Sequence, residues 1–150
     1  MTERPNLKQS APGIYQAMVA LDRLVSEALA AAGIGPGFAH LLRLRASQIN
    51  HCAYCIKVHT RDALAGGEAA ERATVLPAWR ETGYFSEKER AALELVEAIT
   101  LISEGQVPDA TYERAATILS KGEIVAIEWL AIAINSWNRI AISSRYPVGP

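Results

Sequence analysis

The chain has helical hydrophobic periodicity along nearly its whole length, and this feature limits its fold more than any other. Apolar residues recur at intervals of three and four, as at Ile14, Met18, Leu21, Val25 and Leu29. Such spacing lines them along one face of an α-helix, whereas a strand would need apolar residues at alternate positions. No segment shows that alternation, so the sequence predicts an all-α bundle of about six to seven helices.

Capping residues divide this pattern into separate helices. Ser86 with Glu89, and Ser120 with Glu123, have the spacing of capping boxes, in which serine and glutamate each cap the other's backbone amide. Pro36 suits a first helical turn, and glycines mark the ends of several segments. We therefore expect helices over about 10–33, 38–49, 50–65, 68–76, 86–104, from 109 onward, and over 124–143.

The last of these segments, IVAIEWLAIAINSWNRIAI, is apolar around most of its circumference. A helix without a polar face is normally covered on all sides. A chain of 150 residues offers few elements that could surround it, so we expect a neighbouring subunit to supply part of the cover. The alternative is a central helix buried within its own monomer.

Size and charge narrow the class of protein. A chain of 150 residues is an ordinary length for one domain, taken here as 1–150, which buries about 70% of its unfolded surface. The formal net charge of -1 indicates neither nucleic acid nor an anionic membrane as a partner. The start, MTERPNLKQSAPG, lacks the apolar run of a signal peptide, and no segment reaches the roughly 20 apolar residues of a membrane span. We expect a cytoplasmic protein.

The stretch ASQINHCAYCIKVH, residues 46–59, contains both cysteines and two of the three histidines. On a helix, Cys52, Cys55 and His59 project from one stripe, because three and then four residues separate them. At a helix start capped by Asn50, free backbone amides and the positive end of the helix dipole favour a thiolate. His59 can take the thiol proton. A disulfide would need a deformable first turn, since mid-helix Cβ atoms three residues apart are about 5 to 6 Å from each other.

Two other interpretations compete with thiol chemistry. A single cysteine is most often a small buried apolar residue, and a single histidine is most often structural. A zinc site made of His40, Cys52, Cys55 and His59 would offer four nitrogen and sulfur ligands. Structural zinc usually holds together segments that lack their own core, whereas this chain has ample apolar helix. The grouping of these residues at one helix start therefore favours thiol chemistry.

The segment LRASQINHCAYCIKVHT resembles the signature of the alkyl hydroperoxidase D-like (AhpD-like) branch of the carboxymuconolactone decarboxylase superfamily. The later helices and the closing AINSWNRIAISSR are also similar to that branch, so the resemblance covers about residues 14–145. It implies an all-α fold assembled as a trimer or a hexamer. It also implies a dithiol that reduces peroxides and is recycled by a dithiol or protein reductant. We expect no cofactor and no metal ion.

The resemblance assigns roles to individual residues. Cys55 corresponds to the cysteine that attacks the peroxide, and Cys52 to the one that then closes the disulfide. His59 corresponds to the histidine of a proton relay that activates the thiols. Twelve residues before the first cysteine, where the branch usually has glutamate, this chain has His40. A histidine is neutral or cationic where glutamate is anionic, so His40 would favour the thiolate while acting as a weaker base.

Other positions near the motif are open to two interpretations. His51 stands where glycine is common in the branch, and it either tunes Cys52 or is simply exposed. Tyr54 stands where well-studied members have histidine, and we expect it to pack. Residues 137–139, Trp-Asn-Arg, either line a pocket between subunits or form a satisfied polar cluster within an interface, the more common case.

The sequence therefore predicts a thiol-dependent peroxidase that acts on small hydroperoxides. Cys52 and Cys55 would cycle between dithiol and disulfide, with His59 and His40 as the proton relay. One alternative is an oligomeric module for thiol-disulfide exchange, redox sensing or zinc binding. Another is a decarboxylase of a lactone acid, as in the other branch of the superfamily, although that chemistry does not depend on a dithiol. Neither the particular peroxide nor the electron donor follows from the motif.

Overall fold

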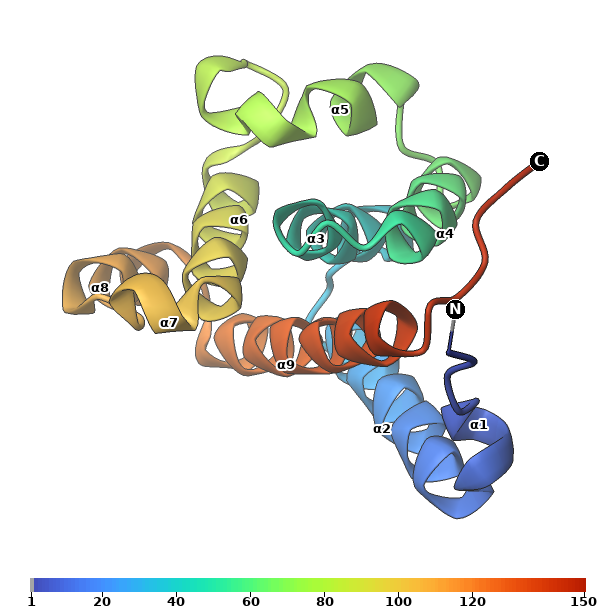
Figure 1. The fold of residues 1–150 in the computed structure, drawn as a ribbon. Helices are drawn as coiled ribbons and strands as arrows, with labels where there is room; N and C mark the ends of the chain where they lie inside the picture. Colours follow the sequence, from blue (N-terminus) through green and yellow to red (C-terminus); the bar gives the residue numbers. More distant parts are fainter. Residues whose placement is uncertain (1) are drawn as a thin grey trace.

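The computed structural model describes residues 2–150, and within that range it contains helices and no strand. This confirms the all-α prediction (Figure 1). The helices of ten or more residues are α2 (Pro12–Ala31), α3 (Pro36–Ile49), α4 (Ala53–Ala65), α6 (Glu87–Thr100), α8 (Asp109–Ile118) and α9 (Lys121–Ser143). Shorter segments join or precede them: α1 (Leu7–Ser10), α5 (Ala70–Val75), the 3₁₀ helix η1 (Leu76–Glu81) and α7 (Ile102–Gly105). None of the described helices combines the length and apolar character that a membrane-spanning helix requires.

Helix α3 lies at the centre of the fold, in contact with α4, α6 and α9 (Figure 1). It begins at Pro36, whose missing amide hydrogen costs nothing in a first turn. Leu41, Leu42 and Leu44 of this helix are fully buried. Burying a leucine side chain stabilises the fold by about 1.5 to 3 kcal/mol, so these three side chains anchor α3 to the elements around it.

Both predicted capping boxes are present. Ser86 Oγ accepts a hydrogen bond from the Glu89 amide while the Glu89 carboxylate accepts one from the Ser86 amide, and Ser120 and Glu123 do the same. The helix expected over 86–104 is interrupted, however. Leu101 leaves the helical conformation at ψ 31° and separates α6 from α7.

Helix α2 differs from its predicted packing. Of the five apolar residues expected on its core face, only Val25 and Leu29, in its second half, are buried, and Ile14 is 73% exposed. Figure 1 shows why: the first half of α2, together with α1, projects away from the other helices. Met18 and Leu21 are half-buried, so the chain leaves mainly the N-terminal end of the expected face uncovered.

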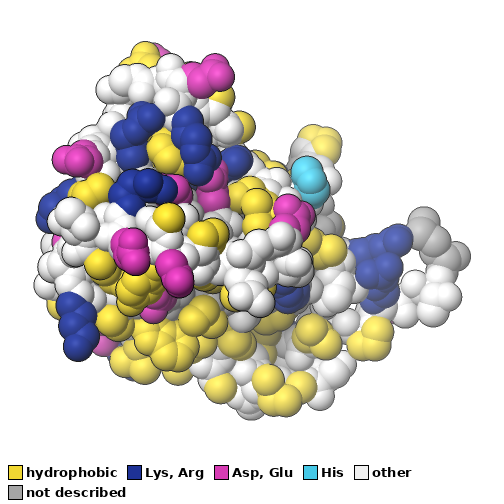
Figure 2. Space-filling model, turned by 90° about the vertical axis from the view of Figure 1, so that its left-hand side faces the viewer, with side chains coloured by type: hydrophobic (Ala, Val, Ile, Leu, Met, Phe, Trp, Pro, Cys, Tyr) yellow, Lys and Arg dark blue, Asp and Glu magenta, His cyan; other side chains and the backbone are white. Residues whose placement is uncertain are grey.

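Helix α9 was expected to be covered on all sides, and within the single chain it is not. Val125, Trp129 and Ile132 follow one another at four- and three-residue spacing along α9, and all three are exposed. Figure 2, which views the molecule from the left of Figure 1, shows hydrophobic side chains gathered in its lower half and charged ones mainly above. We call the three residues the α9 stripe.

Candidate active site

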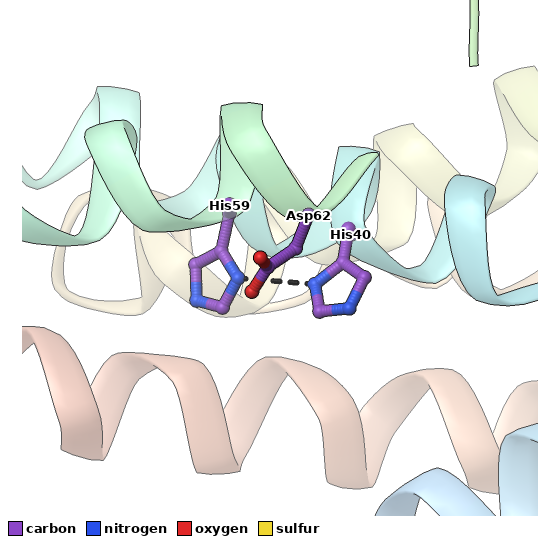
Figure 3. Close-up of side chains that lie close together, drawn as sticks. All are labelled: His40, His59 and Asp62. Carbon is purple, nitrogen blue, oxygen red and sulfur yellow. Dashed lines mark hydrogen bonds between the residues drawn. The ribbon is translucent and has the colours of Figure 1, made fainter. Parts of the chain in front are cut away.

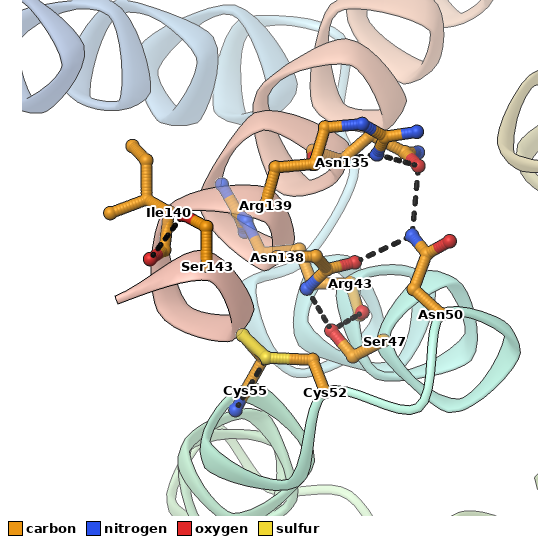
Figure 4. Close-up of a disulfide and its surroundings, with 10 residues drawn as sticks. All are labelled: Arg43, Ser47, Asn50, Cys52, Cys55, Asn135, Asn138, Arg139, Ile140 and Ser143. Atoms are coloured by element: carbon orange, nitrogen blue, oxygen red, sulfur yellow. Dashed lines mark hydrogen bonds between the residues drawn. A yellow bond between two sulfur atoms is a disulfide. The ribbon is translucent and has the colours of Figure 1, made fainter. Parts of the chain in front are cut away.

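Cys52 and Cys55 form a disulfide at the beginning of α4, with their Cα atoms 5.3 Å apart (Figure 4). The pair is not set within regular helix. Cys52 is the N-cap residue of α4, with extended backbone at φ -84° and ψ 91°, and its Sγ accepts a hydrogen bond from the Cys55 amide at 3.3 Å. An N-cap residue is free of helical geometry, so it can bring its sulfur to the residue three positions later. The deformable first turn that the sequence required is therefore present.

The turn before Cys52 corrects the expected role of Asn50. Asn50 does not cap α4; it is the C-cap residue that follows α3, and His51 then turns the chain with a left-handed φ of 55°. A left-handed residue with a side chain costs about 1 to 2 kcal/mol, whereas glycine adopts this conformation freely. This explains why glycine suits position 51. The His51 side chain is exposed.

A buried amide network holds this turn against α9 (Figure 4). Asn50 Nδ2 donates to the side-chain oxygens of both Asn135 and Asn138, at 2.9 Å each. Asn138, which is fully buried, donates in turn to Ser47 Oγ at 3.0 Å. Part of the expected polar cluster at 137–139 is therefore satisfied within one chain, while Trp137 lines a cavity and Arg139 is exposed. The network holds Ser47 and Asn50, which precede Cys52, and the Cys52 amide donates to the Ser47 carbonyl oxygen at 3.0 Å, so the position of Cys52 is tied to α9.

The two cysteines differ in their access to solvent. Cys52 is 1% and Cys55 4% exposed, and both pack against Ala141 and Tyr146. A cavity of about 180 Å³ reaches Cys55 but not Cys52. It is largely aromatic and apolar, and it is lined by Tyr15, Asp22, Tyr54, Cys55, Val58, His59, Trp137, Ala141 and Tyr146. In this oxidised form, the cavity therefore offers a small molecule a route to the Cys55 sulfur.

Aromatic pairs shape the cavity walls. The rings of Tyr54 and Tyr146 meet edge to face with centroids 5.0 Å apart, and those of Tyr15 and Trp137 do so at 5.4 Å. Such pairs contribute about 0.5 to 1.5 kcal/mol beyond their burial. Tyr54 packs as expected. Tyr15 and Tyr146, far from the motif in sequence, were not predicted.

His59, which lines this cavity, lies against His40 (Figure 3). His59 comes from α4 and His40 from α3, and their Nδ1 atoms are 3.1 Å apart. Burial, followed by the positive charge of Arg43, lowers the pKa of His59 to about 3. Burial and Arg43 also lower the pKa of His40. Both imidazoles are therefore neutral near pH 7, and His40 does not supply the positive charge that the sequence allowed for.

Arg43 supplies that charge instead, and sequence reasoning missed it. Its side chain is buried, donates to Ser26 Oγ at 3.1 Å, and lies 3.7 Å from the Asp22 carboxylate. Arg43 follows His40 by three residues, so the two share a face of α3. An arginine on the buried face of an apolar helix was the available signal, because a buried charge usually has a specific partner or function.

Asp62 is the second residue that sequence reasoning missed. It follows His59 by three residues on α4, and it lies with His59 and His40 in one cluster (Figure 3). Its Oδ1 accepts a hydrogen bond from Arg61 Nε at 2.7 Å, and this bond, set against partial burial, lowers the pKa of Asp62. Asp62 is therefore an anion beside two neutral imidazoles.

A close approach of α3 and α4 holds the histidines together. Gly37, one turn before His40, faces Gly66 so closely that a Cβ atom added at Gly37 would lie 2.8 Å from the Gly66 carbonyl oxygen. A glycine at each contact point allows the backbones to meet, and His40, one turn after Gly37, then faces His59, about two turns before Gly66. The position of the histidine pair therefore depends on these two glycines.

The four-ligand zinc site considered from the sequence does not fit this form of the protein. His40 and His59 are adjacent, but Cys52 and Cys55 are bonded to each other and have no thiolate to offer. What the structure does bring together is a CxxC disulfide, two paired histidines and an aromatic cavity in an all-α protein.

Comparisons with known proteins support that class. A model of the carboxymuconolactone decarboxylase family matches residues 12–98. The uncharacterized protein YdfG from Bacillus subtilis is 36% identical over 143 residues, which are 95% of each chain. The crystal structure of ATU0492 from Agrobacterium tumefaciens, a protein of unknown function suggested to be the antioxidant defence protein AhpD, superposes with a TM-score of 0.88. It is 36% identical to this chain, and the match covers 99% of this chain and 100% of the other.

The chain therefore belongs to the carboxymuconolactone decarboxylase family, in its AhpD-like branch. The resemblance inferred from the cysteine motif is confirmed.

Proposed function

We propose that the protein is a thiol-dependent peroxidase that reduces small organic hydroperoxides through a Cys52–Cys55 dithiol and disulfide cycle. The observation that carries the proposal is that Cys55 lines the cavity, whereas Cys52 is not among its lining residues, and that His59 lines the same cavity. A nucleophilic sulfur, a proton acceptor and a space for substrate are thereby adjacent.

In the proposed cycle, the Cys55 thiolate attacks the terminal oxygen of the hydroperoxide. The O–O bond breaks, the alkoxide leaves and takes a proton to become the alcohol, and Cys55 becomes a sulfenic acid. The Cys52 sulfur then attacks the Cys55 sulfur, water leaves, and the disulfide closes. An external dithiol returns two electrons by exchange and restores both thiols.

The histidine pair supports the first step. With its Nδ1 engaged by His40, His59 has Nε2 available to accept the thiol proton. A new thiolate on Cys55 places a negative charge in the same low-dielectric cavity, which favours a protonated His59 over the neutral form that its lowered pKa gives beside the disulfide. His59 can then share its other proton with His40. This sequence uses histidine where the branch usually uses a carboxylate.

The cavity favours a particular class of substrate. Its walls are mostly aromatic and apolar, which suits the hydrocarbon part of an organic hydroperoxide better than hydrogen peroxide. Its volume of about 180 Å³ is below the roughly 300 Å³ at which sites for drug-sized ligands begin. The reductant must reach the same sulfur, so we expect a small dithiol, or a protein that presents one on a slender arm.

The test is a count of free thiols before and after one equivalent of cumene hydroperoxide or hydrogen peroxide, followed by turnover with several dithiols. We expect two thiols lost per chain, faster with the organic peroxide. Cys55→Ser should abolish turnover, and Cys52→Ser should retain one rapid oxidation that stops at a sulfenic acid. Equal rates in the two variants would contradict the assigned roles. A chain that closes the disulfide with disulfide donors but consumes no peroxide would be a thiol-disulfide exchange protein.

We also propose that the protein is a homo-oligomer, a trimer or a hexamer as is usual in this branch. The exposed α9 stripe and the projecting first half of α2 support this, since exposed apolar surface at helical spacing marks sites of association. Light scattering coupled to size-exclusion chromatography tests the mass. A monomer at micromolar concentration would overturn this proposal without affecting the peroxidase assignment.

A further inference from the structure

His40, His59 and Asp62 form a cluster with the composition of a metal site (Figure 3). One ligand atom from each side chain lies within 4.8 Å of the ligand atoms of the other two. Two of the side chains, His59 and Asp62, stand one turn apart on α4, and His40 faces them from α3. All three are partly buried, so the cluster is neither an exposed acidic patch nor a dry core contact.

We propose that these three residues bind one zinc-class divalent metal ion, with a fourth coordination position left for water or another small ligand. Two imidazole nitrogens and one carboxylate oxygen are a ligand set that zinc uses when it keeps an open position. Calcium and magnesium prefer oxygen ligands alone, so the two histidines favour zinc or a similar transition metal. This inference does not depend on the proposed peroxidase activity.

The distance between the histidines fits such an ion. Zinc-nitrogen bonds are about 2.0 to 2.1 Å, so two nitrogens 3.1 Å apart would subtend an angle of about 95 to 100° at the metal. That angle is near the tetrahedral value and needs only a small opening of the pair. Two Nδ1 atoms at 3.1 Å also cannot both carry hydrogens in the space between them, so at least one lone pair already points into the gap.

Asp62 can complete the set with a small movement. Ligands of one tetrahedral zinc ion are about 3.4 Å apart, so a carboxylate oxygen within 4.8 Å needs to shift by on the order of 1 Å. The Asp62 side chain is 29% exposed and has room to move. Its partner Arg61 is 71% exposed, so Arg61 can turn into solvent when a cation takes its place.

The surroundings provide a rigid frame and a path of entry. The two helices are held by the close contact at Gly37 and Gly66, and ligands on helices are better positioned than ligands on loops. His59 lines the cavity that reaches Cys55, and His40 lines a second cavity on the side of α2. An ion can therefore reach the pair from solvent.

The charges that face the cluster come from three helices. Arg43 on α3 and Arg61 on α4 oppose a cation, whereas Asp22 on α2 and Asp62 favour one. Arg43 is 3.7 Å from Asp22, which offsets its charge, and Arg61 is free to move away from the site. The remaining charge is the Asp62 carboxylate, which is a ligand.

The experiment uses the oxidised full chain, in which the disulfide removes both thiols as ligands. Zinc chloride is titrated by calorimetry, and cobalt(II) is titrated by visible absorption as a probe of tetrahedral coordination. We expect one ion per chain. His40→Ala, His59→Ala and Asp62→Ala should each weaken binding more than about tenfold, because even an outer-shell partner of a metal ligand contributes about 10- to 100-fold. His51→Asn is the matched control, since asparagine tolerates the left-handed turn and position 51 is outside the cluster.

A measurement on the unaltered protein guards against variants that fail to fold. In the ¹⁵N-labelled chain, zinc should shift the imidazole nitrogen signals of His40 and His59 and leave those of His51 unchanged. The inference is overturned if the oxidised chain binds no ion saturably, if binding survives loss of either histidine, or if His51 responds equally. Binding that ignores Asp62→Ala would overturn the three-ligand site. If the protein reduces peroxide but binds no zinc, the metal site is overturned, and His40 and His59 are a hydrogen-bonded pair only.

Discussion

Glu97 is the buried acid on which α6 depends, and its replacement by glutamine is a direct test of the packing described above. Its carboxylate accepts hydrogen bonds from Trp79 Nε1 at 2.8 Å, Arg45 Nε at 2.8 Å and Arg80 Nη1 at 2.5 Å. These donors come from α3 and from η1, so one carboxylate ties three elements together. Glu97→Gln keeps the size of the side chain and removes the charge.

The expected cost follows from these three bonds. A hydrogen bond to a charged group contributes about 1.5 to 3 kcal/mol and one between neutral groups about 0.5 to 1.5, so the Trp79 and Arg45 bonds should each lose about 1 kcal/mol. The Arg80 side chain is 54% exposed, which limits its share to less than about 1 kcal/mol. Glu97→Gln should therefore lower the free energy of unfolding by about 2 to 3 kcal/mol at pH 7.

The loss should depend on pH. Burial alone would raise the pKa of Glu97, but the hydrogen bonds from Trp79, Arg45 and Arg80 outweigh burial and lower it. A lowered pKa in the folded state contributes stability that is present above the unfolded value of about 4.3 and is lost as the pH falls through the folded pKa. The difference between Glu97→Gln and the natural chain should therefore shrink below about pH 4.

Urea unfolding followed by circular dichroism measures this difference at pH 7, 5, 4 and 3.5. The disulfide is kept intact and the chain concentration is held constant. The control is Glu94→Gln, also on α6, because the partner of Glu94, Arg114, is largely exposed and such a pair contributes about 0 to 1 kcal/mol. A Glu97→Gln cost no larger than that of Glu94→Gln, or one unchanged between pH 7 and 3.5, would refute this account of Glu97.

Three further outcomes are expected. Gly37→Ala should destabilise the fold by about 1 to 3 kcal/mol, because a methyl group there meets the Gly66 carbonyl oxygen. Gly35→Ala, whose methyl group meets nothing within 4 Å, should be nearly neutral, and urea unfolding measures both variants. His40→Glu restores the carboxylate usual in the branch and should change the pKa of the Cys55 thiol, which the pH dependence of alkylation measures. If the thiol pKa and the rate of peroxide reduction are both unchanged, residue 40 takes no part in a relay. Trp129→Glu places a charge on the α9 stripe and should lower the mass measured by light scattering, and an unchanged mass would remove the stripe from the subunit interface.

The helices could be predicted from sequence because their signals are local. The capping boxes at Ser86 and Ser120 each lie within four residues, and Pro36 begins its helix as expected. Asn50 shows the limit of such signals. Asparagine caps helices well, yet here its amide is used in bonds to Asn135 and Asn138, which are 85 and 88 residues away. A tertiary contact of that kind has no trace in the local pattern.

The candidate site was predictable in its residues and less so in its arrangement. Spacing grouped Cys52, Cys55 and His59, and the structure brings Cys52 to Cys55 and His59 to His40, although the extended backbone of Cys52 takes it off the expected helical stripe. The low exposure of the sulfurs and the aromatic cavity depend on Tyr15 and Tyr146, which reach the site from opposite ends of the chain. Only the packing of α2 and α9 around the motif brings these residues together.

The two sulfurs of the disulfide have different environments, one suited to access and the other to stabilising a thiolate. Cys55 lines the cavity and is the sulfur that a small molecule can reach. The Cys52 sulfur accepts a hydrogen bond from the Cys55 amide at the N-terminus of α4, where a thiolate is stabilised. In thiol exchange, the thiol of lower pKa leaves faster. Under the proposed cycle, a reductant that enters the cavity attacks Cys55 and expels Cys52 as a stabilised thiolate. The peroxide then meets Cys55 by the same route, so one cavity can serve both halves of the cycle only if reductant and peroxide occupy it in turn.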